Sequence, residues 1–370
     1  MQIILHIGTW KTGSSAVQVF MARNADLLAQ QGVFLPSVVH EENGHTLLFR
    51  YATCKGPERE ALVAELQAIA ERRPDGRVII SSEHFWPLSA DEIEDLAATL
   101  HRVSNDVRVL VYLRPQDEMW GSMYAQQAKT FQVTPDAPVW GTGDFVSRAM
   151  LEWALYYEKC LSMFEKAFGG GSVTPRIYKR SNFIAGDVVL DFLAFAGIEN
   201  DPDFDRYEGD TNPSFGWKSV ALSLWFVDVA YPQLRKVNAL PDIRRMFRAA
   251  IGDMYARRKD PHWLGAAAEV LSGEDRREIR AHYQADNQRL FDRYFGGEDV
   301  FGPPDDTTKA PLTHTELSPF EFNRARARLM AQCRLAGLDM AGTEPAFATP
   351  SVLSVQSMRH ALSDFAARWG

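Results

Sequence analysis

The residues best suited to chemistry lie in one short segment near the amino terminus, HIGTWKTGSSAVQ at residues 6–18. Gly8 and Gly13 permit a tight turn, and Lys11 places a positive charge inside it. Hydroxyl groups follow at Thr12, Ser14 and Ser15. A turn that opens into a helix offers unpaired backbone N–H groups and the positive end of the helix dipole. The segment therefore predicts an anion-binding loop.

This loop differs from the Walker sequence GxxxxGK[ST], because its lysine precedes the second glycine. A Walker lysine reaches the β- and γ-phosphates of a nucleotide, and the adjacent hydroxyl holds magnesium. The earlier position of Lys11 suits a shorter anionic group. The alternative is an ordinary strand–turn–helix, in which Lys11 and the serines only face water.

A second set of candidate anion ligands follows the apolar run VRVLVYL at 107–113. Arg114 comes directly after this run, and Ser122 lies eight positions later on a predicted helix. A guanidinium group is planar and donates paired hydrogen bonds to phosphate oxygens, which makes Arg114 a candidate phosphate ligand. The alternative is a surface ion pair between Arg114 and Asp117 or Glu118.

Two groups that can accept a proton, Glu83 and His84, come directly after the run RVIISS at 77–82. A hydroxyl that acts as a nucleophile must lose its proton to a base within hydrogen-bonding reach. Consecutive residues usually point in different directions, so we expect only one of the two to face a ligand. The alternative for Glu83 is a helix N-cap or a surface carboxylate.

Tryptophans lie beside the candidate segments, at Trp10, Trp86 and Trp120. Their flat apolar faces suit stacking on a sugar ring or another amphipathic acceptor, although tryptophan equally forms part of a core or a cleft wall. His45, in HEENGH at 40–45, is a further candidate contact for an acceptor. No third ligand accompanies the histidines of that segment, so we expect no metal site there.

The elements that must position these residues can be read from the apolar spacing. Strand-like runs occur at 2–7, 77–82, 107–113 and about 173–178. Helical spacing occurs at 14–30, about 58–72, 90–102, after 113 through Lys129, at 148–167 and near 187–196. Alternation of strands and helices predicts a three-layer α/β fold with a central parallel sheet. In such sheets ligands gather beyond the carboxyl ends of the strands, where the candidate residues lie.

Taken in order, these segments resemble the family of sulfotransferases that use 3'-phosphoadenosine 5'-phosphosulfate (PAPS), especially its bacterial members. The loop is similar to the family's 5'-phosphosulfate loop, and the spacing of Arg114 and Ser122 is similar to its 3'-phosphate motif. The segments at 176–198 and 286–295 resemble later parts of the family sequence. The resemblance covers residues 1–230 in pieces, and implies a P-loop-like sulfotransferase fold and transfer of a sulfuryl group to an acceptor hydroxyl.

The resemblance also assigns roles to individual residues. It implies that Lys11 stabilises the leaving phosphate, that Glu83 is the general base and that His84 is the second choice. Cofactor contacts are expected from the loop residues Lys11 to Ser15 and from Arg114, Ser122, Tyr178, Asn212 and Ser214. Acceptor contacts are expected from His45, Trp86 and Trp120, with a carbohydrate or glycoconjugate as acceptor. No metal is required, and the late RKG motif of cytosolic animal members is absent from the sequence.

Composition limits the partners and the compartment. The formal net charge of −8 disfavours binding of a polyanion, so we expect no nucleic-acid partner. The three cysteines form no metal-ligand spacing and fit a reducing compartment. No run approaches the ~20 apolar residues that span a bilayer, and the chain opens on a strand-like run. We therefore expect a cytoplasmic protein without a membrane span.

We expect residues 1–300 to form the sulfotransferase domain and residues 301–370 to form a linker and a helical extension packed on it. Two other functions remain open at this point. A P-loop kinase for a small molecule predicts dependence on ATP and magnesium, with Glu83 as the nearest candidate for its acidic residue. A non-catalytic nucleotide-binding module predicts binding without transfer. The acceptor and the oligomeric state cannot be read from the sequence.

Overall fold

A computed structural model describes residues 1–37, 56–130, 153–206, 271, 273–305, 323, 326–327, 330–331 and 334–335, with the backbone alone for 124–130. The chain divides into two compact units. The first comprises Met1–Met119, Glu152–Pro213 and His282–Pro303, and the second comprises Trp120–Leu151, Ser214–Ala281 and Pro304–Gly370. The predicted boundary at residue 300 stays a prediction, because most of 301–370 lies outside the described residues.

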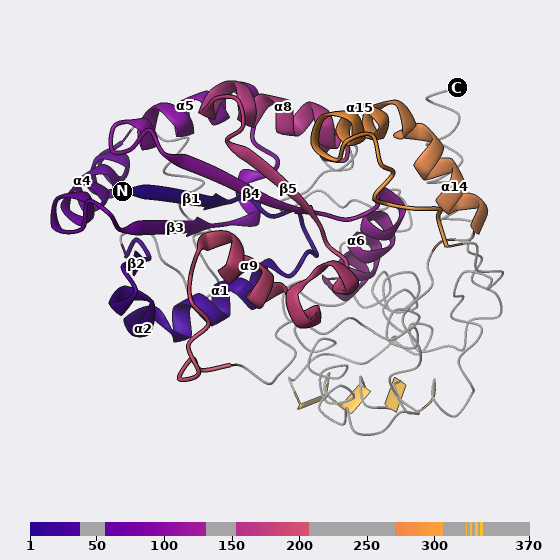
Figure 1. Cartoon of the computed structure of the whole chain (residues 1–370). Coiled ribbons are helices and arrows are strands. Elements are labelled where there is room, and N and C mark those ends of the chain that lie inside the picture. The colour runs from indigo at the N-terminus through magenta and orange to yellow at the C-terminus, as the bar shows by residue number, and fades with distance from the viewer. Residues whose placement is uncertain are drawn as a thin grey trace. The chain divides into compact units, whose positions relative to one another are not determined.

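The first unit is built on five parallel strands in the order β2-β3-β1-β4-β5 (Figure 1). The strands span Gln2–His6 (β1), Val33–Phe34 (β2), Arg77–Ser81 (β3), Val107–Leu113 (β4) and Val173–Ile177 (β5). The chain leaves β1 toward one edge of the sheet and leaves β4 toward the other, so its direction reverses between these two neighbours. A reversal of this kind opens a crevice at the carboxyl ends of the strands. The predicted α/β class and parallel sheet are confirmed.

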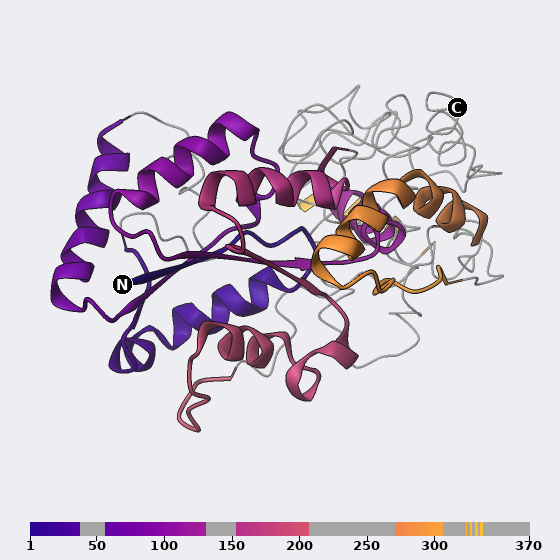
Figure 2. The same cartoon turned by 45° about the horizontal axis from the view of Figure 1, so that its top comes forward.

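Helices cover both faces of this sheet (Figure 2). One face carries α1 (Ser14–Arg23), α2 (Ala25–Gln30) and α9 (Val188–Ala196), and the other carries α4 (Pro57–Arg72), α5 (Ala90–His101) and α8 (Tyr157–Phe168). The central strands are apolar throughout because both of their faces are buried: Ile3, Ile4 and Leu5 of β1 are fully covered. Within the described residues, no helix combines the length and the apolar character needed to cross a membrane.

The segment that resembled a family ending forms α15 (Gln284–Tyr294), which packs on α8. Asp286 accepts a hydrogen bond from the backbone N–H of Glu158 at 2.9 Å, and so caps the first turn of α8 from a distant part of the sequence. Burial raises the pKa of Asp286, and the hydrogen bonds from the backbone N–H groups of Glu158 and Lys159 act against that rise. Arg293 of α15 pairs with Glu158 at 2.9 Å. The described residues also include the helices α6 (Gln116–Thr130) and α14 (Gly273–His282) and short 3₁₀ turns at Glu83–Phe85, Arg180–Asn182 and Ile184–Gly186.

The helix predicted at 14–30 is interrupted at Asn24, which separates α1 from α2. The side-chain amide of Asn24 donates to the carbonyl oxygen of Phe20 at 2.8 Å, while its oxygen accepts from the backbone N–H of Asp205 at 2.7 Å. Asparagine competes for backbone hydrogen bonds in this way, and here the competition ends the helix. The helix predicted at 148–167 is interrupted as well: residues 153–154 are helical, residues 155–156 are not, and α8 begins at Tyr157, while residues 148–152 lie outside the described part of the chain.

A buried polar group ties β4 to α9. The hydroxyl of Tyr112 donates to Asp191 Oδ2 at 2.7 Å, and the other oxygen of Asp191 pairs with Arg176 at 2.7 Å. Tyr112 is fully buried, and the side chain of Asp191 is 1% exposed. Burial raises the pKa of Tyr112, and the neighbouring carboxylate of Asp191 raises it further, so the phenol stays protonated and remains a donor.

We expect Tyr112→Phe to lower the free energy of unfolding by about 2 kcal/mol, because one oxygen of a buried carboxylate loses its donor. The midpoint of urea unfolding measures this change. Tyr294→Phe is a matched control: its hydroxyl donates at 3.1 Å to Glu165, which keeps its ion pair with Arg293. We expect Tyr294→Phe to lower the free energy of unfolding clearly less than Tyr112→Phe does. Equal losses in the two variants would contradict the importance of the buried pair.

Candidate active site

Chain segments from four strands emerge together at the carboxyl edge of the sheet. They are residues 7–13 after β1, residues 82–84 after β3, Arg114 after β4 and Tyr178 after β5. Strand-like pairing continues past the strand ends, since Ile7 N–H donates to Leu110 O at 3.0 Å and Tyr178 N–H donates to Leu113 O at 2.7 Å. All four segments therefore begin at the same edge of the sheet, and backbone hydrogen bonds hold the first residues of two of them in place.

The loop after β1 adopts an unusual backbone conformation. Both Lys11, with φ of 61°, and Gly13, with φ of 79°, lie in the left-handed region. A side chain at Gly13 would place its Cβ 3.0 Å from Tyr178 Cε2 and 3.1 Å from Val188 Cγ1, so only glycine fits without displacement. A lysine in this region is strained by about 1 kcal/mol. Strain held in this way is typical of ligand-binding turns, whose amides point toward an anion.

The hydroxyls of the two loop threonines are used inside the structure. Thr12 is fully buried and donates to Thr9 O at 2.5 Å. Thr9 donates in turn to Tyr112 O at 2.8 Å, which anchors the loop to β4. The sequence predicts that the hydroxyl of Thr12 contacts an anion, and the structure instead commits that hydroxyl to the loop itself. Ser15 is half-buried in the first turn of α1.

Glu83 lies against the loop. Its Oε2 atom accepts a hydrogen bond of 2.5 Å from the hydroxyl of Ser14, the first residue of α1. Ser82 caps the short 3₁₀ turn that carries Glu83, by accepting from His84 N–H at 3.2 Å. The N-cap in this turn is therefore Ser82, and the carboxylate of Glu83 is half-buried beside the loop. His84 is also half-buried.

Arg114 and the loop lie at the same edge and meet through Tyr178. The guanidinium carbon of Arg114 lies over the Tyr178 ring, 5.0 Å from its centre, and the Cε2 atom and hydroxyl of that ring lie nearest Gly13. Arg114 Nε also lies 3.4 Å from Glu118 Oε2, which is the ion pair predicted as the alternative for this residue. Its side chain is 24% exposed. The arginine is thus held in place by a ring and a carboxylate, with part of its surface open.

His6, which the sequence did not single out, lies beneath the loop at the end of β1. It is 1% exposed, and its Nδ1 atom lies 2.8 Å from the hydroxyl of Ser81. Its Nε2 atom has no hydrogen-bond partner in the structure. Burial lowers the pKa of His6 to about 4, so the ring is neutral at physiological pH. The sequence feature that could have identified His6 is its position as a polar residue at the end of an apolar run.

Of the three residues predicted to contact the acceptor, the structure describes Trp86 and Trp120. Trp86 is 1% exposed, its indole N–H donates to Ala154 O at 2.9 Å, and its ring packs edge-on against Tyr157. The prediction that Trp86 stacks on an acceptor is therefore wrong for this structure, because no face of the ring is open. Trp120 is 7% exposed. The remaining predicted residues His45, Asn212 and Ser214 lie outside the described residues, and Ser122, which is half-buried, belongs with Trp120 to the second unit.

Comparisons with known proteins give limited guidance. No family model matches the chain. An uncharacterized protein from Archaeoglobus fulgidus is 27% identical over 226 residues, which are 60% of this chain and 55% of that protein, so the chain spans just over half the length of this relative. A crystal structure of a sulfotransferase from Alicyclobacillus acidocaldarius matches 61% of this chain and 90% of its own, at 15% identity and a TM-score of 0.33. Function must therefore be argued from the residues at the edge of the sheet.

The burial of His6 predicts a pH dependence of stability. Its pKa is about 4 in the folded chain and 6.5 in an ordinary setting, so the unfolded chain binds the proton more readily. The stabilisation is complete above pH 6.5, is lost as the pH falls toward 4, and amounts to about 3 kcal/mol. Urea unfolding of the wild type and of His6→Asn between these limits measures it. Parallel curves for the two proteins would contradict the assignment.

Proposed function

We propose that this protein is a sulfotransferase, which moves a sulfuryl group from PAPS to a hydroxyl group of an acceptor. The observation that carries the proposal is the convergence at one sheet edge of a left-handed lysine loop, a carboxylate and an arginine, linked through Tyr178. The order of these residues in the sequence resembles that of PAPS-dependent enzymes, which supports the role proposed for each of them.

The residues at this edge fit a nucleotide that carries an anionic group at each end. The turn at Lys11 and Gly13 forms a cradle that a Cβ at Gly13 would fill, and its lysine brings a positive charge. The start of α1 adds the positive end of a helix dipole. Arg114, which lies over the Tyr178 ring, provides a second cationic group for a phosphate. Two separated positive sites favour a bisphosphorylated adenosine over a single phosphate.

The proposed chemistry assigns one task to each side chain. The bound donor supplies the sulfuryl group, whose bond to the phosphate oxygen breaks as a bond to the acceptor oxygen forms. Glu83 accepts the proton that the acceptor hydroxyl loses. Lys11 offsets the negative charge that develops on the leaving phosphate oxygen. No metal ion is needed for this balance of charge.

The contact between Ser14 and Glu83 couples the loop to the base. A serine hydroxyl has one proton to donate, and in this structure it goes to Glu83 at 2.5 Å. An anion in the loop competes for the same proton. When Ser14 turns to that anion, Glu83 Oε2 is released and can accept from an acceptor hydroxyl. The base would then become fully available only when the donor is in place.

The acceptor class rests on the family resemblance, which favours a carbohydrate or a glycoconjugate. The buried position of Trp86 removes one expected stacking surface for a sugar. His84, half-buried next to Glu83, is the second choice for the base. We keep the roles of Ser122, Asn212, Ser214 and His45 as parts of the proposal.

One observation favours a second function, a P-loop kinase for a small molecule. A hydroxyl at the start of α1 beside an acidic residue after the neighbouring strand is the pair that holds magnesium in P-loop nucleotide hydrolases. Ser14 and Glu83 form a pair of this kind. The position of Lys11 before the second glycine argues for the sulfotransferase. Comparison of the two nucleotides therefore decides between the functions.

We expect 3'-phosphoadenosine 5'-phosphate to bind more tightly than ATP with magnesium, as measured by calorimetric titration. Arg114→Ala should weaken that binding about tenfold to a hundredfold, because a charged hydrogen bond to phosphate contributes about 1.5–3 kcal/mol. Glu118→Gln is the matched control, since it removes the ion pair at 3.4 Å and keeps the arginine. Preference for ATP, or loss of binding in the control alone, would contradict the assignment.

We expect Glu83→Gln to lower the transfer rate by about a hundredfold or more, because the proton loses its acceptor. Binding of 3'-phosphoadenosine 5'-phosphate should change little, since the glutamine oxygen can still accept from Ser14. The measurement is transfer of label from radiolabelled PAPS to a panel of saccharides. His84→Gln, the matched control, should stay active. An active Glu83→Gln beside an inactive His84→Gln would move the base to His84, and activity in neither the wild type nor the variants would favour a binding module.

A further inference from the structure

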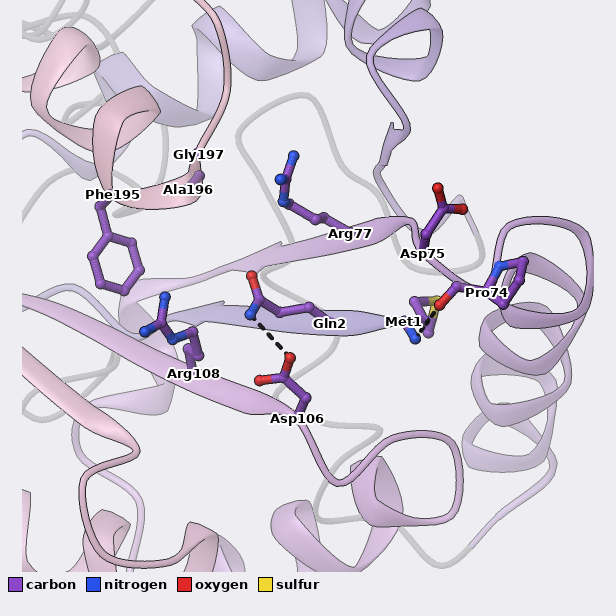
Figure 3. A pocket seen from close by; sticks show the side chains of 10 residues that line it. All are labelled: Met1, Gln2, Pro74, Asp75, Arg77, Asp106, Arg108, Phe195, Ala196 and Gly197. Atoms are coloured by element: carbon purple, nitrogen blue, oxygen red, sulfur yellow. Dashed lines mark hydrogen bonds between the residues drawn. The ribbon is translucent and has the colours of Figure 1, made fainter.

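A pocket of about 430 Å³ lies at the amino edge of the sheet, at the opposite end of the strands from the loop (Figure 3). It is lined by the beginnings of β1, β3 and β4, by the turn before β3 and by the end of α9. Its volume lies within the range of about 300–1,000 Å³ that is typical of sites for small molecules. None of the residues of the proposed sulfotransferase site lines it, so the two sites can be tested separately.

The strand register directs two arginines into this pocket. Gln2 of β1 pairs with Arg77 of β3, and Ile4, two residues further along β1, pairs with Arg108 of β4. Paired residues share a face of the sheet, as do residues two apart on a strand, so both arginines project on the face of Ile4. That face is covered by α9, because Ile4 and Phe192 belong to the same core cluster. Two strand spacings of about 4.8 Å and an offset of two residues along the strand separate the two arginine backbones by about 12 Å.

The charges that line the pocket are not neutralised by direct contacts. Within the described residues, Arg77, Arg108 and Asp75 form no ion pair or side-chain hydrogen bond. Arg108 lies over the ring of Phe195, with its guanidinium carbon 5.9 Å from the ring centre. Asp106 differs from Asp75, because it accepts a hydrogen bond from Gln2 at 3.0 Å. The pocket therefore offers two guanidinium groups, one open carboxylate and one apolar wall. The terminal ammonium of Met1 also lines it and donates to Pro74 O.

We infer that this pocket binds a small zwitterion, an α-amino acid with an apolar side chain. The carboxylate of the ligand pairs with Arg77 and Arg108, and its ammonium group pairs with Asp75. The side chain of the ligand packs on Phe195 at the end of α9. A simple anion satisfies the arginines alone and meets the negative charges of Asp75 and Asp106. A ligand with both signs of charge satisfies both sets of groups.

A purely structural reading competes for Arg77. Its guanidinium lies beside Gly197, where a Cβ would be 3.5 Å from one terminal nitrogen, at the negative end of α9. A cation at a helix C-terminus is stabilising, so Arg77 has a role in the fold without a ligand. Arg108 and Asp75 are exposed and have no side-chain hydrogen bond or ion pair within the described residues, which makes them better positions for a test.

The test uses three probes of one shape on the full chain: L-leucine, 4-methylpentanoate, which lacks the ammonium group, and 3-methylbutylamine, which lacks the carboxylate. We expect L-leucine, or another amino acid from a panel, to bind at least about tenfold more tightly than its two truncated analogues in calorimetric titration. Asp75→Asn and Arg108→Gln should each weaken binding about tenfold or more. Arg73→Gln is the matched control, because this exposed arginine in the same turn does not line the pocket.

Several outcomes would overturn the inference. If no amino acid binds at millimolar concentration, the inference of an amino-acid site is wrong. Tighter binding of inorganic phosphate than of any amino acid makes the pocket a simple anion site. Unchanged amino-acid binding in both Asp75→Asn and Arg108→Gln, with the fold intact by circular dichroism, places the ligand elsewhere. Binding that responds to these variants but not to Arg73→Gln supports the inference, whatever the chain transfers at its other edge.

Discussion

The close approach of the loop to the ring of Tyr178 is the constraint on which the candidate site depends. Gly13 has no side chain and a left-handed backbone, so α1 can begin directly against Tyr178 and Val188. The same ring carries the guanidinium of Arg114 at 5.0 Å. The loop and the guanidinium of Arg114, about a hundred positions apart in the sequence, therefore contact the same aromatic side chain. A rigid ring shared in this way presets the distance between the groups before any ligand arrives.

Polar contacts, more than apolar ones, hold the loop from below. His6 ends β1 as a neutral ring bonded to Ser81, and Gln18 of α1 donates to the same serine hydroxyl at 3.2 Å. Thr9 reaches across to a carbonyl oxygen of β4. Burial of polar groups is tolerated only when partners are supplied, and nearly all of these groups have one. The exception is His6 Nε2, which lies against the backbone of Gly8, where a Cβ would come within 3.3 Å. Glycine at that position is therefore a matter of close approach, since its φ is not left-handed.

Local sequence predicts the frame of this protein well, and contacts between distant residues account for what it misses. The runs that form β1, β3 and β4 are apolar because both faces of the sheet are covered, and β4 spans the predicted residues 107–113. The break at Asn24 could not be foreseen, because its partner Asp205 is 181 positions away. The contact of Ser14 with Glu83 likewise depends on the pairing of β1 with β3. Trp86 looks like a ligand contact in sequence, and only packing against Tyr157 shows it to be core.

The helix α9 joins the two ends of this architecture. Its first residue, Val188, closes the turn at Gly13, and the residue after its last turn, Gly197, lies beside Arg77 in the pocket at the other edge. Nine residues of α-helix span about 13 Å, which is shorter than the span of about 17 Å of the five-residue strand β1. A helix that is hydrogen-bonded throughout moves as a body. A ligand that fixes the end of α9 at the amino edge would therefore also fix the wall of the loop at the carboxyl edge. The physical link between the edges is then one rigid element packed at both ends, and no chain of intermediate side chains is needed to explain it.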